Sequence, residues 1–491
     1  MCCCLGVAMK YTATIGLEVH AQILTKSKMF SGCNAAYASA PANSCIDEVS
    51  IGLPGTLPVV NQEAIRKAAL LGLALNCEIP EYCEFSRKSY TYPDLPKAWQ
   101  ITMYDKPICI NGELEITLGN GETKRVGITR AHLEEDTGML QHGDETHSLV
   151  DYNRSGVPLL EIVSEPDMTT PEEARLYATK LRQILVFLGV NSGNLEEGAL
   201  RVDANVSIRP EGQKEFGTKV EIKNMNSFRN LERALVYELE RQEKVLREGG
   251  TIIQETRGWD DAAGITLSQR SKEHAHDYRY FPEPDLPPLE LSREWVAERR
   301  AELPELPDAK FARYLSEFGL SKQDAALLSG ERETADYFET IVATAGAANA
   351  KPVANWITGE LFRLIKDGAE TLAEVAKRVT PANLTSLIDV VAKGEIGSTV
   401  AKQVFEEMYR TGETPTAIIN AKGLRQISDS SVLTQAARDA IAANPKVVAD
   451  YKSGKLPAIK FLVGQVMRAT KGQANPQVVE EALKTELDAT N

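Results

Sequence analysis

The sequence has few cysteines and no long apolar run. Its eight cysteines are spread over 491 residues without a regular spacing, which excludes a disulfide-framed scaffold and favours a reducing compartment. No apolar stretch approaches the roughly 20 residues that span a bilayer. The first residues also lack the basic and apolar regions of a signal peptide. We therefore expect a cytoplasmic protein without a membrane segment.

Several familiar catalytic motifs are also missing. The chain has no G-x-x-x-x-G-K-[ST] and no G-x-G-x-x-G after a strand, so an ATP site, if present, is built differently. It has no G-x-S-x-G and no cysteine set among His and acid partners, so we do not expect it to hydrolyse an amide donor itself. A net charge of −14 argues against sequence-independent coating of nucleic acid but leaves room for a local basic patch.

What is present is a long mixed segment followed by a helical one. From residue 11 to about residue 280, period-two stretches alternate with helical patterns, which predicts an α+β domain built on a mainly antiparallel sheet. Prolines cluster between Phe281 and Pro307, and a second break falls near Arg410–Pro415. The predicted domains are therefore 11–290, an all-α domain at 291–410 and a small α-helical tail at 411–491. We expect residues 1–10 to be a non-native or disordered start, because the first convincing strand directly follows Met9 and Lys10.

Capping patterns predict where several helices begin and end. Thr170-Pro171-Glu172-Glu173 begins a helix that should stop at Gly189. Ser227 begins a long helix that should end at Gly249-Gly250. In the helical part, three of the expected segments are Ala335–Thr344, Pro352–Lys366 and Val400–Tyr409.

Four strand-like stretches carry polar residues two positions apart, which places these residues on one face of each strand. If the four polar faces belong to one sheet, they form a cradle of carboxylates, imidazoles and cations, which suits nucleotide-dependent phosphoryl transfer with Mg²⁺. A solvated sheet face with salt-linked strands fits the spacing equally well. The positions are Glu18, His20 and Gln22; Arg130, His132 and Glu134; Arg201, Asp203, Asn205 and Ser207; and Lys219, Glu221 and Lys223.

Residues 85–100 interleave cations with aromatic side chains. Such a segment could seat the end of a single-stranded nucleic acid, with rings stacking on bases and cations meeting phosphates. A proline-pinned loop whose aromatic residues cover the core explains the same pattern and is the simpler reading. The residues are Arg87, Lys88, Tyr90, Tyr92, Lys97 and Trp99.

A stretch near the C-terminus reverses the charge of this acidic chain. Between Tyr451 and Val479 there is no Asp or Glu. This local excess of positive charge indicates contact with a phosphate backbone, although a solvated helix face fits equally well. Its cations are Lys452, Lys455, Lys460, Arg468 and Lys471.

Longer blocks of the chain closely resemble the B subunits (GatB) of tRNA-dependent amidotransferases. The blocks follow the family's order, cover nearly the whole chain and are far more specific than any short motif. They include Ile15-Gly-Leu-Glu-Val-His-Ala-Gln22, Ser89-Tyr-Thr-Tyr-Pro-Asp-Leu-Pro-Lys97, Leu133-Glu-Glu-Asp-Thr-Gly138, Asp151-Tyr-Asn-Arg-Ser-Gly-Val-Pro-Leu-Leu-Glu161, Arg201-Val-Asp-Ala-Asn-Val-Ser207 and Val220-Glu-Ile-Lys-Asn-Met-Asn-Ser227.

The resemblance implies a fold and a reaction. The fold is a catalytic cradle related to glutamine synthetase, followed by a helical domain and a tail domain that contacts tRNA. In the reaction, ATP phosphorylates the side-chain carboxylate of Glu-tRNA(Gln) or Asp-tRNA(Asn), and ammonia displaces the phosphate to give the amide. A separate amidase, the A subunit, supplies the ammonia from glutamine, and a small C subunit joins the two.

The resemblance also implies roles for individual residues. Glu18, His20 and Glu134 are the candidate Mg²⁺ and phosphate site, and Asp203 and Glu221 are the next catalytic candidates. The loop expected near the aminoacylated tRNA end contributes Lys88, Tyr90, Tyr92 and Lys97. The tail positions expected to contact the tRNA backbone are Lys460, Arg468 and Lys471.

One departure concerns zinc. Some family members carry F-C-x-C followed by C-x-x-C, a spacing suited to a four-thiolate zinc site. Here the corresponding positions are Ser31, Cys33, Cys45 and Glu48. Two thiolates are lost, so we do not expect structural zinc.

Two other functions fit the sequence. One is a non-catalytic tRNA-binding scaffold whose charged strand faces only stabilise it, and the other is a stand-alone ATP-dependent ligase that uses free ammonia. ATP hydrolysis that depends on misacylated tRNA distinguishes an enzyme from the scaffold. A requirement for an amidase partner excludes the stand-alone ligase.

Overall fold

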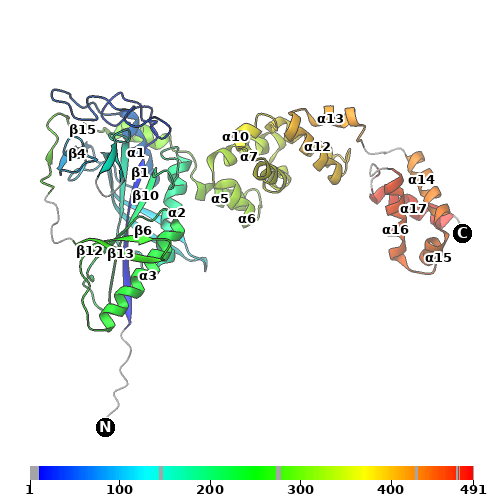
Figure 1. Ribbon diagram of the computed structural model, residues 1–491. Helices are drawn as coiled ribbons and strands as arrows, with labels where there is room; N and C mark the ends of the chain where they lie inside the picture. The colour runs from blue at the N-terminus through cyan, green and yellow to red at the C-terminus, as the bar shows by residue number, and fades with distance from the viewer. Residues whose placement is uncertain are drawn as a thin grey trace, which may run out of the picture. The chain divides into compact units, whose positions relative to one another are not determined.

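The computed structural model describes residues 10–142, 147–271, 278–425, 430–470, 474 and 476–489. The chain divides into two compact units, Met1–Pro307 and Asp308–Asn491. The first unit is mixed α and β, and the described elements of the second are helical (Figure 1). The predicted α+β class is confirmed. The predicted limits at 290 and 410 stay predictions, and residues 1–9 of the expected start lie outside the described residues.

The first unit contains an eight-stranded sheet with the order β13-β12-β11-β10-β1-β9-β6-β5. Neighbouring strands are antiparallel, except that β11 and β12 are parallel. The sheet is therefore mainly antiparallel, as predicted. The strand bounds are β1 (Tyr11–Gln22), β5 (Cys109–Thr117), β6 (Thr123–Glu135), β9 (Pro158–Ser164), β10 (Leu200–Pro210), β11 (Val220–Lys223), β12 (Glu255–Asp260) and β13 (Ile265–Ser271).

The register of this sheet brings the four predicted polar stretches together. Glu18 on β1 lies opposite Asp203 on β10. His20, two residues along β1, lies opposite Arg201 on one side and Glu161 of β9 on the other. Because β11 adjoins β10 and β6 adjoins β9, all four stretches belong to one sheet, which is the condition under which their polar faces form a cradle.

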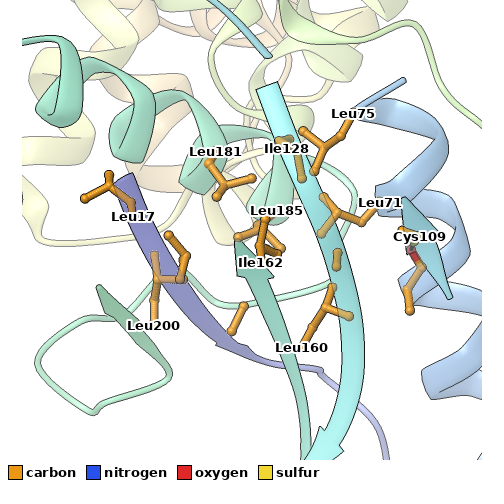
Figure 2. Close-up of a cluster of buried hydrophobic side chains, with 14 of the residues drawn as sticks. Leu17, Leu71, Leu75, Cys109, Ile128, Leu160, Ile162, Leu181, Leu185 and Leu200 are labelled. Carbon is orange, nitrogen blue, oxygen red and sulfur yellow. Dashed lines mark hydrogen bonds between the residues drawn. The ribbon is translucent and has the colours of Figure 1, made fainter. Parts of the chain in front are cut away.

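Helices α1 (Gln62–Ala74), α2 (Pro171–Phe187) and α3 (Phe228–Arg247) cover the apolar face of the sheet. The alternate residues of β1 that face them are completely or almost completely buried. Figure 2 shows apolar side chains of the strands meeting those of α1 and α2 in one cluster. Burial on this side leaves the polar side chains of the strands on the opposite face. The labelled residues include Leu17, Leu71, Leu160, Ile162, Leu181 and Leu200.

The predicted helix caps are present. The Thr170 side chain and the Glu173 side chain form a capping box at the start of α2, and Gly189 follows the helix with a φ of +64°. Ser227 accepts a hydrogen bond from the Asn230 amide at the start of α3. That helix ends just before Gly249, whose φ is +79°.

Short strands join the proline-rich segment to the region of the polar face. The strand β14 pairs with β3, which pairs with β4, and β15 pairs with β2. Thr102 of β4 donates to a Glu134 carboxylate oxygen at 3.1 Å, so the β3–β4 hairpin lies beside the end of β6. The bounds are β2 (Tyr82–Cys83), β3 (Ser86–Ser89), β4 (Trp99–Thr102), β7 (Met139–His142), β8 (Ser148–Asp151), β14 (Phe281–Pro282), β15 (Leu289–Glu290) and α4 (Arg293–Ala301).

The second unit contains two separate apolar clusters, one formed between Tyr314 and Ile419 and one between Leu433 and Leu487. Its helices are α5 (Pro307–Ser316), α6 (Lys322–Ser329), α7 (Arg332–Ala345), η2 (Ala347–Asn349), α8 (Ala350–Asn355), η3 (Trp356–Leu361), α9 (Phe362–Gly368), α10 (Leu372–Val375), α11 (Pro381–Ala392), α12 (Ser398–Thr411), α13 (Pro415–Lys422), α14 (Ser430–Ala443), α15 (Pro445–Lys452), η4 (Leu456–Ala458), α16 (Ile459–Ala469) and α17 (Pro476–Ala489). None of the helices in the described ranges has the length and apolarity that crossing a membrane requires.

One predicted helix is interrupted. The segment expected to be helical over 352–366 changes to π-helical geometry at Trp356–Leu361. Within it, the Thr358 hydroxyl donates to the Ala354 carbonyl oxygen at 3.0 Å and to Asp324 at 3.0 Å.

Candidate active site

The polar face of the sheet opens into a cleft of about 1080 Å³. Most of the sequence-predicted catalytic and substrate-binding residues line it: His20, Lys88, Tyr90, Tyr92, Glu134, Asp203 and Glu221. Two do not. Glu18 lines a smaller neighbouring pocket of about 280 Å³, and Lys97 lines another of about 330 Å³.

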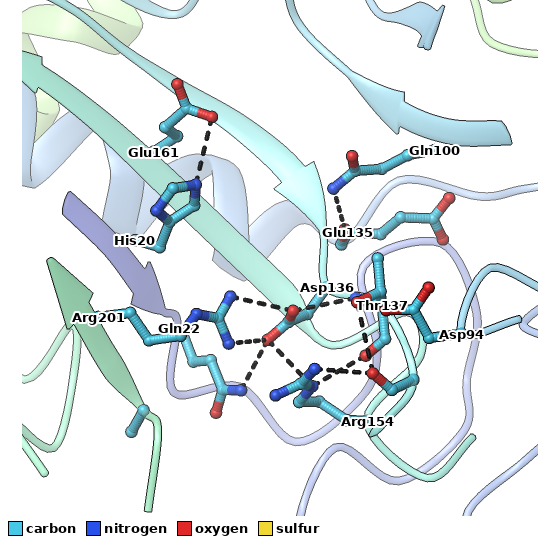
Figure 3. Close-up of polar contacts among 12 residues, drawn as sticks. His20, Gln22, Asp94, Gln100, Glu135, Asp136, Thr137, Arg154, Glu161 and Arg201 are labelled. Carbon is cyan, nitrogen blue, oxygen red and sulfur yellow. Dashed lines mark hydrogen bonds and ion pairs between the residues drawn. The ribbon is translucent and has the colours of Figure 1, made fainter. Parts of the chain in front are cut away.

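A first trio of ligating side chains consists of His20, Glu134 and Glu161. Their nearest ligand atoms all lie within 4.8 Å of one another. His20 Nε2 lies 3.5 Å from Glu161 Oε2, the contact drawn in Figure 3. His132 Nε2 lies 3.6 Å from the same oxygen. An imidazole nitrogen and two carboxylates from three strands thus converge on one point.

Burial and neighbouring charges shift the pKa values of the two carboxylates of this trio in opposite directions. Burial, followed by the charge of Glu161, raises the pKa of Glu134 to about 7. Burial alone would also raise the pKa of Glu161, but the charge that His132 carries when protonated, together with the hydrogen bond and charge of His20, holds it well below its usual range. Burial lowers the pKa of His132 to about 4, so this imidazole is neutral at pH 7.

A second trio consists of Glu18, Asp203 and Glu221, whose ligand atoms also lie within 4.8 Å of one another. The ammonium of Lys223 lies 3.0 Å from Asp203 and 3.2 Å from Glu221. Burial alone would lower the pKa of Lys223, but these two carboxylates raise it. Burial, and then the charge of Glu161, raises the pKa of Glu18. The two trios are therefore close enough to interact electrostatically.

Among the described residues, the only groups of three or more potential metal ligands within this distance are these two trios. Three carboxylates in one trio, and two carboxylates with an imidazole in the other, form a donor set that a divalent cation can use. The residues present therefore fit the magnesium expected from the sequence.

The β3–β4 hairpin supplies aromatic and cationic groups to the cleft. The Lys88 ammonium lies 4.9 Å from the centroid of the Tyr278 ring, and the rings of Tyr90 and Tyr278 are 5.8 Å apart, edge to face. Tyr92 is 53% exposed. Lys97 instead forms a buried ion pair with Glu135. The hairpin therefore presents three of the four predicted residues to the cleft.

A network of charged and polar side chains lies along one side of the cleft. Asp136 accepts hydrogen bonds from both terminal nitrogens of Arg201 at 3.1 Å and from Gln22 at 2.8 Å (Figure 3). Arg154 lies 3.7 Å from Asp136 and donates to the carbonyls of Thr137 and Gly138. Burial would raise the pKa of Asp136, but the two arginines lower it to about 2.

The sequence prediction missed Glu161, Asp136 and Arg154 as site residues. Glu161 interrupts the apolar run of β9 (Pro158–Ser164), and a charged residue within an otherwise apolar strand was the available signal. Asp136 lies one residue beyond β6. It continues the two-residue spacing of Arg130, His132 and Glu134, and the prediction ended that series one position too early.

The positions related to zinc lie in the loop after β1. Cys33 and Cys45 are free, partly buried thiols, and burial raises the pKa of Cys33. The Ser31 hydroxyl accepts a hydrogen bond from the Cys33 amide at 3.3 Å. The expectation about zinc stays a prediction.

The predicted tail residues Lys460 and Arg468 are exposed on α16. Lys471 lies outside the described residues. The buried face of α16 contributes Ile459, Leu462 and Val466 to the apolar cluster of the tail.

Comparisons with known proteins agree with the sequence resemblance. A family model described as the GatB/GatE catalytic domain matches residues 13–297, and one described as the GatB domain matches residues 336–487. The B subunit of the aspartyl/glutamyl-tRNA(Asn/Gln) amidotransferase of Roseiflexus castenholzii is 56% identical over 98% of this chain and 99% of its own length. The protein of the same name from Carboxydothermus hydrogenoformans is 52% identical over 97% of this chain and 99% of its own length. This chain therefore belongs to the family of B subunits of aspartyl/glutamyl-tRNA(Asn/Gln) amidotransferases.

Proposed function

We propose that this chain uses ATP to phosphorylate the side-chain carboxylate of Glu-tRNA(Gln), Asp-tRNA(Asn) or both, and then amidates the acyl phosphate with ammonia. The observation that carries the proposal is the convergence of two trios of metal-ligating side chains on one polar sheet face. A solvated sheet face does not require partly or fully buried carboxylates to lie so close together. The names of the relatives support the choice of aminoacyl-tRNA as substrate.

The two trios would hold magnesium. His20, Glu134 and Glu161 would hold one ion, and Glu18, Asp203 and Glu221 the other. Magnesium would supply positive charge against the triphosphate and polarise the phosphoryl oxygens. ATP and Mg²⁺ are thus the proposed substrate and cofactor.

The chain's own cations complete the phosphate site. Lys223, Lys88 and Arg201 line the same cleft and can stabilise negative charge on a transferring phosphoryl group. The Asp136 carboxylate fixes the Arg201 guanidinium, so little reorganisation is needed during the reaction. We assign the cations to binding and orienting the triphosphate.

The proposed reaction has two steps, phosphorylation and amidation. A side-chain carboxylate oxygen of the aminoacyl group attacks the γ-phosphorus, and ADP leaves. Ammonia then attacks the side-chain carbonyl carbon, and phosphate leaves with the former carboxylate oxygen while the nitrogen loses a proton. Phosphorylation is needed because a carboxylate oxygen is a poor leaving group.

The proposal includes partners. The chain lacks the motifs of an amide hydrolase, so an amidase, the A subunit, would release ammonia from glutamine, with a small C subunit joining the complex. The relatives are named as B subunits, which supports an assembly of several different chains. A cradle related to glutamine synthetase and a cytoplasmic location are part of the same proposal.

The tRNA would contact two parts of the chain. Lys88, Tyr90 and Tyr92 are proposed to seat the aminoacylated end, with Lys97 beside them. In the tail, the tRNA backbone would contact Lys460, Arg468 and Lys471.

The test is co-expression with candidate A and C subunits, followed by assays of ATP hydrolysis and labelled Gln-tRNA or Asn-tRNA formation. We expect hydrolysis only with misacylated tRNA, and amide formation with glutamine only when the amidase is present. A lack of tRNA-dependent hydrolysis would support the scaffold alternative. Equal use of glutamine without the amidase would contradict the proposed partners.

The Glu134→Gln variant provides a direct check of the site. It should lose amide formation and retain tRNA binding, because the tail is unchanged. Glu115→Gln is the matched control, since Glu115 is an exposed residue of β5 in the same sheet. Full activity of Glu134→Gln would refute the assignment.

A further inference from the structure

One carboxylate oxygen in the wall of the cleft lacks a partner. Asp94 lines the cleft, and its Oδ2 accepts a hydrogen bond from the Thr137 hydroxyl at 3.1 Å. Its Oδ1 is shielded from solvent and has no hydrogen-bond partner within the described ranges. A buried, unpaired carboxylate oxygen is costly, and such an atom in a cleft wall indicates a ligand that donates hydrogen bonds.

The protein holds Asp94 firmly in position. The Gly138 amide donates to the Asp94 carbonyl oxygen at 2.8 Å, and the Tyr152 hydroxyl donates to the preceding carbonyl, that of Pro93, at 2.9 Å. A Cβ atom at Gly138 would lie 3.0 Å from the Tyr152 ring and 3.1 Å from the Asp94 carbonyl oxygen. The backbone around Asp94 is therefore closely packed, and Figure 3 shows the side chain beside Thr137. The unpaired oxygen is thus a fixed feature of the cleft.

The surroundings of Asp94 favour a cationic donor. Tyr90, Tyr92 and Tyr278 line the same cleft, and the faces of aromatic rings attract ammonium groups. Burial raises the pKa of Asp94, whereas the Thr137 hydroxyl, the Asp94 amide and the charge of Arg154 lower it, and a bound cation would lower it further. A neutral hydroxyl would satisfy the hydrogen bond but would add no opposing charge to this partly buried carboxylate.

Asp94 lines the same cleft as Tyr90 and as two members of the first trio, His20 and Glu134. An amino acid carries a side-chain carboxylate at one end and an α-ammonium at the other. Bound in this cleft, it offers the carboxylate to the trio and a group of opposite charge to Asp94.

We propose that Asp94 binds the α-ammonium group of the aminoacyl residue on the misacylated tRNA, and so positions the side-chain carboxylate for phosphorylation. The inference rests on the proposed function and names a positioning residue within that site. An aminoacyl ester carries a free primary amine, which is at least partly protonated near neutral pH. A free ammonium ion offers the same chemistry to Asp94, so the test must separate the two sources.

The experiment uses the full chain in complex with its A and C partners. It compares Glu-tRNA(Gln) with its α-N-acetylated form in the wild type and in Asp94→Asn. Asparagine keeps the shape of the side chain and can still accept from Thr137, but it removes the charge. Asp105→Asn is the matched control, because Asp105 is exposed and does not line the cleft.

We expect Asp94→Asn to raise KM for Glu-tRNA(Gln) about 10- to 100-fold, the usual effect of losing a hydrogen bond to a charged group. Acetylation should weaken wild-type kcat/KM by a similar factor and should hardly affect the variant further, because both changes remove the same contact. Asp105→Asn should behave as the wild type. If acetylation leaves the wild type unchanged, the inference is overturned, even if Asp94→Asn does not fold.

A second experiment replaces glutamine by ammonium chloride as the nitrogen donor. We expect the KM for ammonium to be the same in the wild type and in Asp94→Asn. A raised KM for ammonium, with additive effects of acetylation and substitution, would assign Asp94 to ammonium and overturn the inference. If the wild type shows no tRNA-dependent ATP hydrolysis, the proposed function itself is contradicted. If the wild type is active and Asp94→Asn is equally active, only the role of Asp94 is contradicted.

Discussion

His20 Nε2 and Glu161 Oε2 lie 3.5 Å apart on neighbouring strands, and the register of β1 and β9 places the two residues directly opposite each other. His132 of β6 approaches the same carboxylate from the other side. This row across three strands keeps Glu161 ionised in a largely buried position. Glu161 is therefore the permanently charged carboxylate of the first trio, whereas burial pushes Glu134 toward neutrality.

The first prediction is that Glu161→Gln lowers kcat for amide formation at least about 100-fold. The amide keeps the shape but removes the charge on which both imidazoles and the proposed magnesium depend. The measurement is Gln-tRNA formation at saturating ATP and tRNA. Glu115→Gln should retain wild-type kcat, and a Glu161→Gln variant within twofold of the wild type would exclude Glu161 from the site.

The sequence predicted the strands of the site better than their arrangement. Period-two alternation marked β1 correctly, because apolar packing on the helices forces Glu18 and His20 to the opposite face. The pairing of Glu18 with Asp203 could not be predicted. Register depends on the loops and on contacts between residues far apart in the sequence, which no local pattern records.

The site residues that the sequence prediction missed also depend on contacts between distant parts of the chain. Glu161 lies in a strand whose other residues are mostly apolar on both faces, so its sequence shows no alternation of polar and apolar residues. Asp136 lies just beyond a strand end, and only the fold brings Arg201 and Arg154 to it. Lys97 was predicted at the tRNA end because of its loop, but its buried pairing with Glu135 depends on where β6 ends.

The second prediction concerns the Asp136 network. Asp136→Asn should destabilise the chain by about 3 kcal/mol, because the substitution leaves the partly buried guanidiniums of Arg201 and Arg154 without their counter-charge. The measurement is urea denaturation at pH 7. Asp261→Asn, which removes the exposed partner of Arg233, should cost far less, because solvent screens an exposed ion pair. Equal losses in both variants would contradict the structural role of Asp136.

The third prediction concerns pH. The folded-state pKa of His132 is about 4, below the usual unfolded value of about 6.5, so the unfolded chain binds more protons between these values. The contribution of His132 to stability is therefore complete above about pH 6.5 and is lost as the pH falls toward 4. In EDTA, the wild type should lose about 2 kcal/mol more than His132→Gln between pH 7 and pH 4.5. Parallel pH profiles from urea denaturation would contradict this.

The fourth prediction concerns competition between the Lys223 ammonium and a metal ion for the second trio. The Lys223 ammonium occupies the position of a counter-ion beside Asp203 and Glu221. Lys223→Met should strengthen Mn²⁺ binding to this trio about tenfold without ATP, because a competing charge is removed. Calorimetric titration provides the measurement. Lys124→Met, which breaks a pair with Glu173 in the same unit, should leave the affinity unchanged. An unaltered affinity in Lys223→Met would show that the trio does not bind the metal.

The fifth prediction concerns the tail. Replacing both Lys460 and Arg468 by Ala should weaken tRNA binding and reduce the slope of log Kd against log salt by about 2, or about 1 for each lost phosphate contact. Filter binding over a range of KCl concentrations measures this slope. Lys484→Ala is the control, since Lys484 is paired with Glu480 on α17. If the double variant has the same slope as the wild type, these side chains do not contact the tRNA backbone.

The central claim is that phosphorylation of the substrate carboxylate precedes amidation. It is tested by labelling both side-chain carboxylate oxygens of Glu-tRNA(Gln) with ¹⁸O and analysing the inorganic phosphate released by the full complex. An acyl phosphate intermediate transfers one ¹⁸O atom to phosphate for each amide formed. Phosphate that remains unlabelled while Gln-tRNA accumulates would contradict the account.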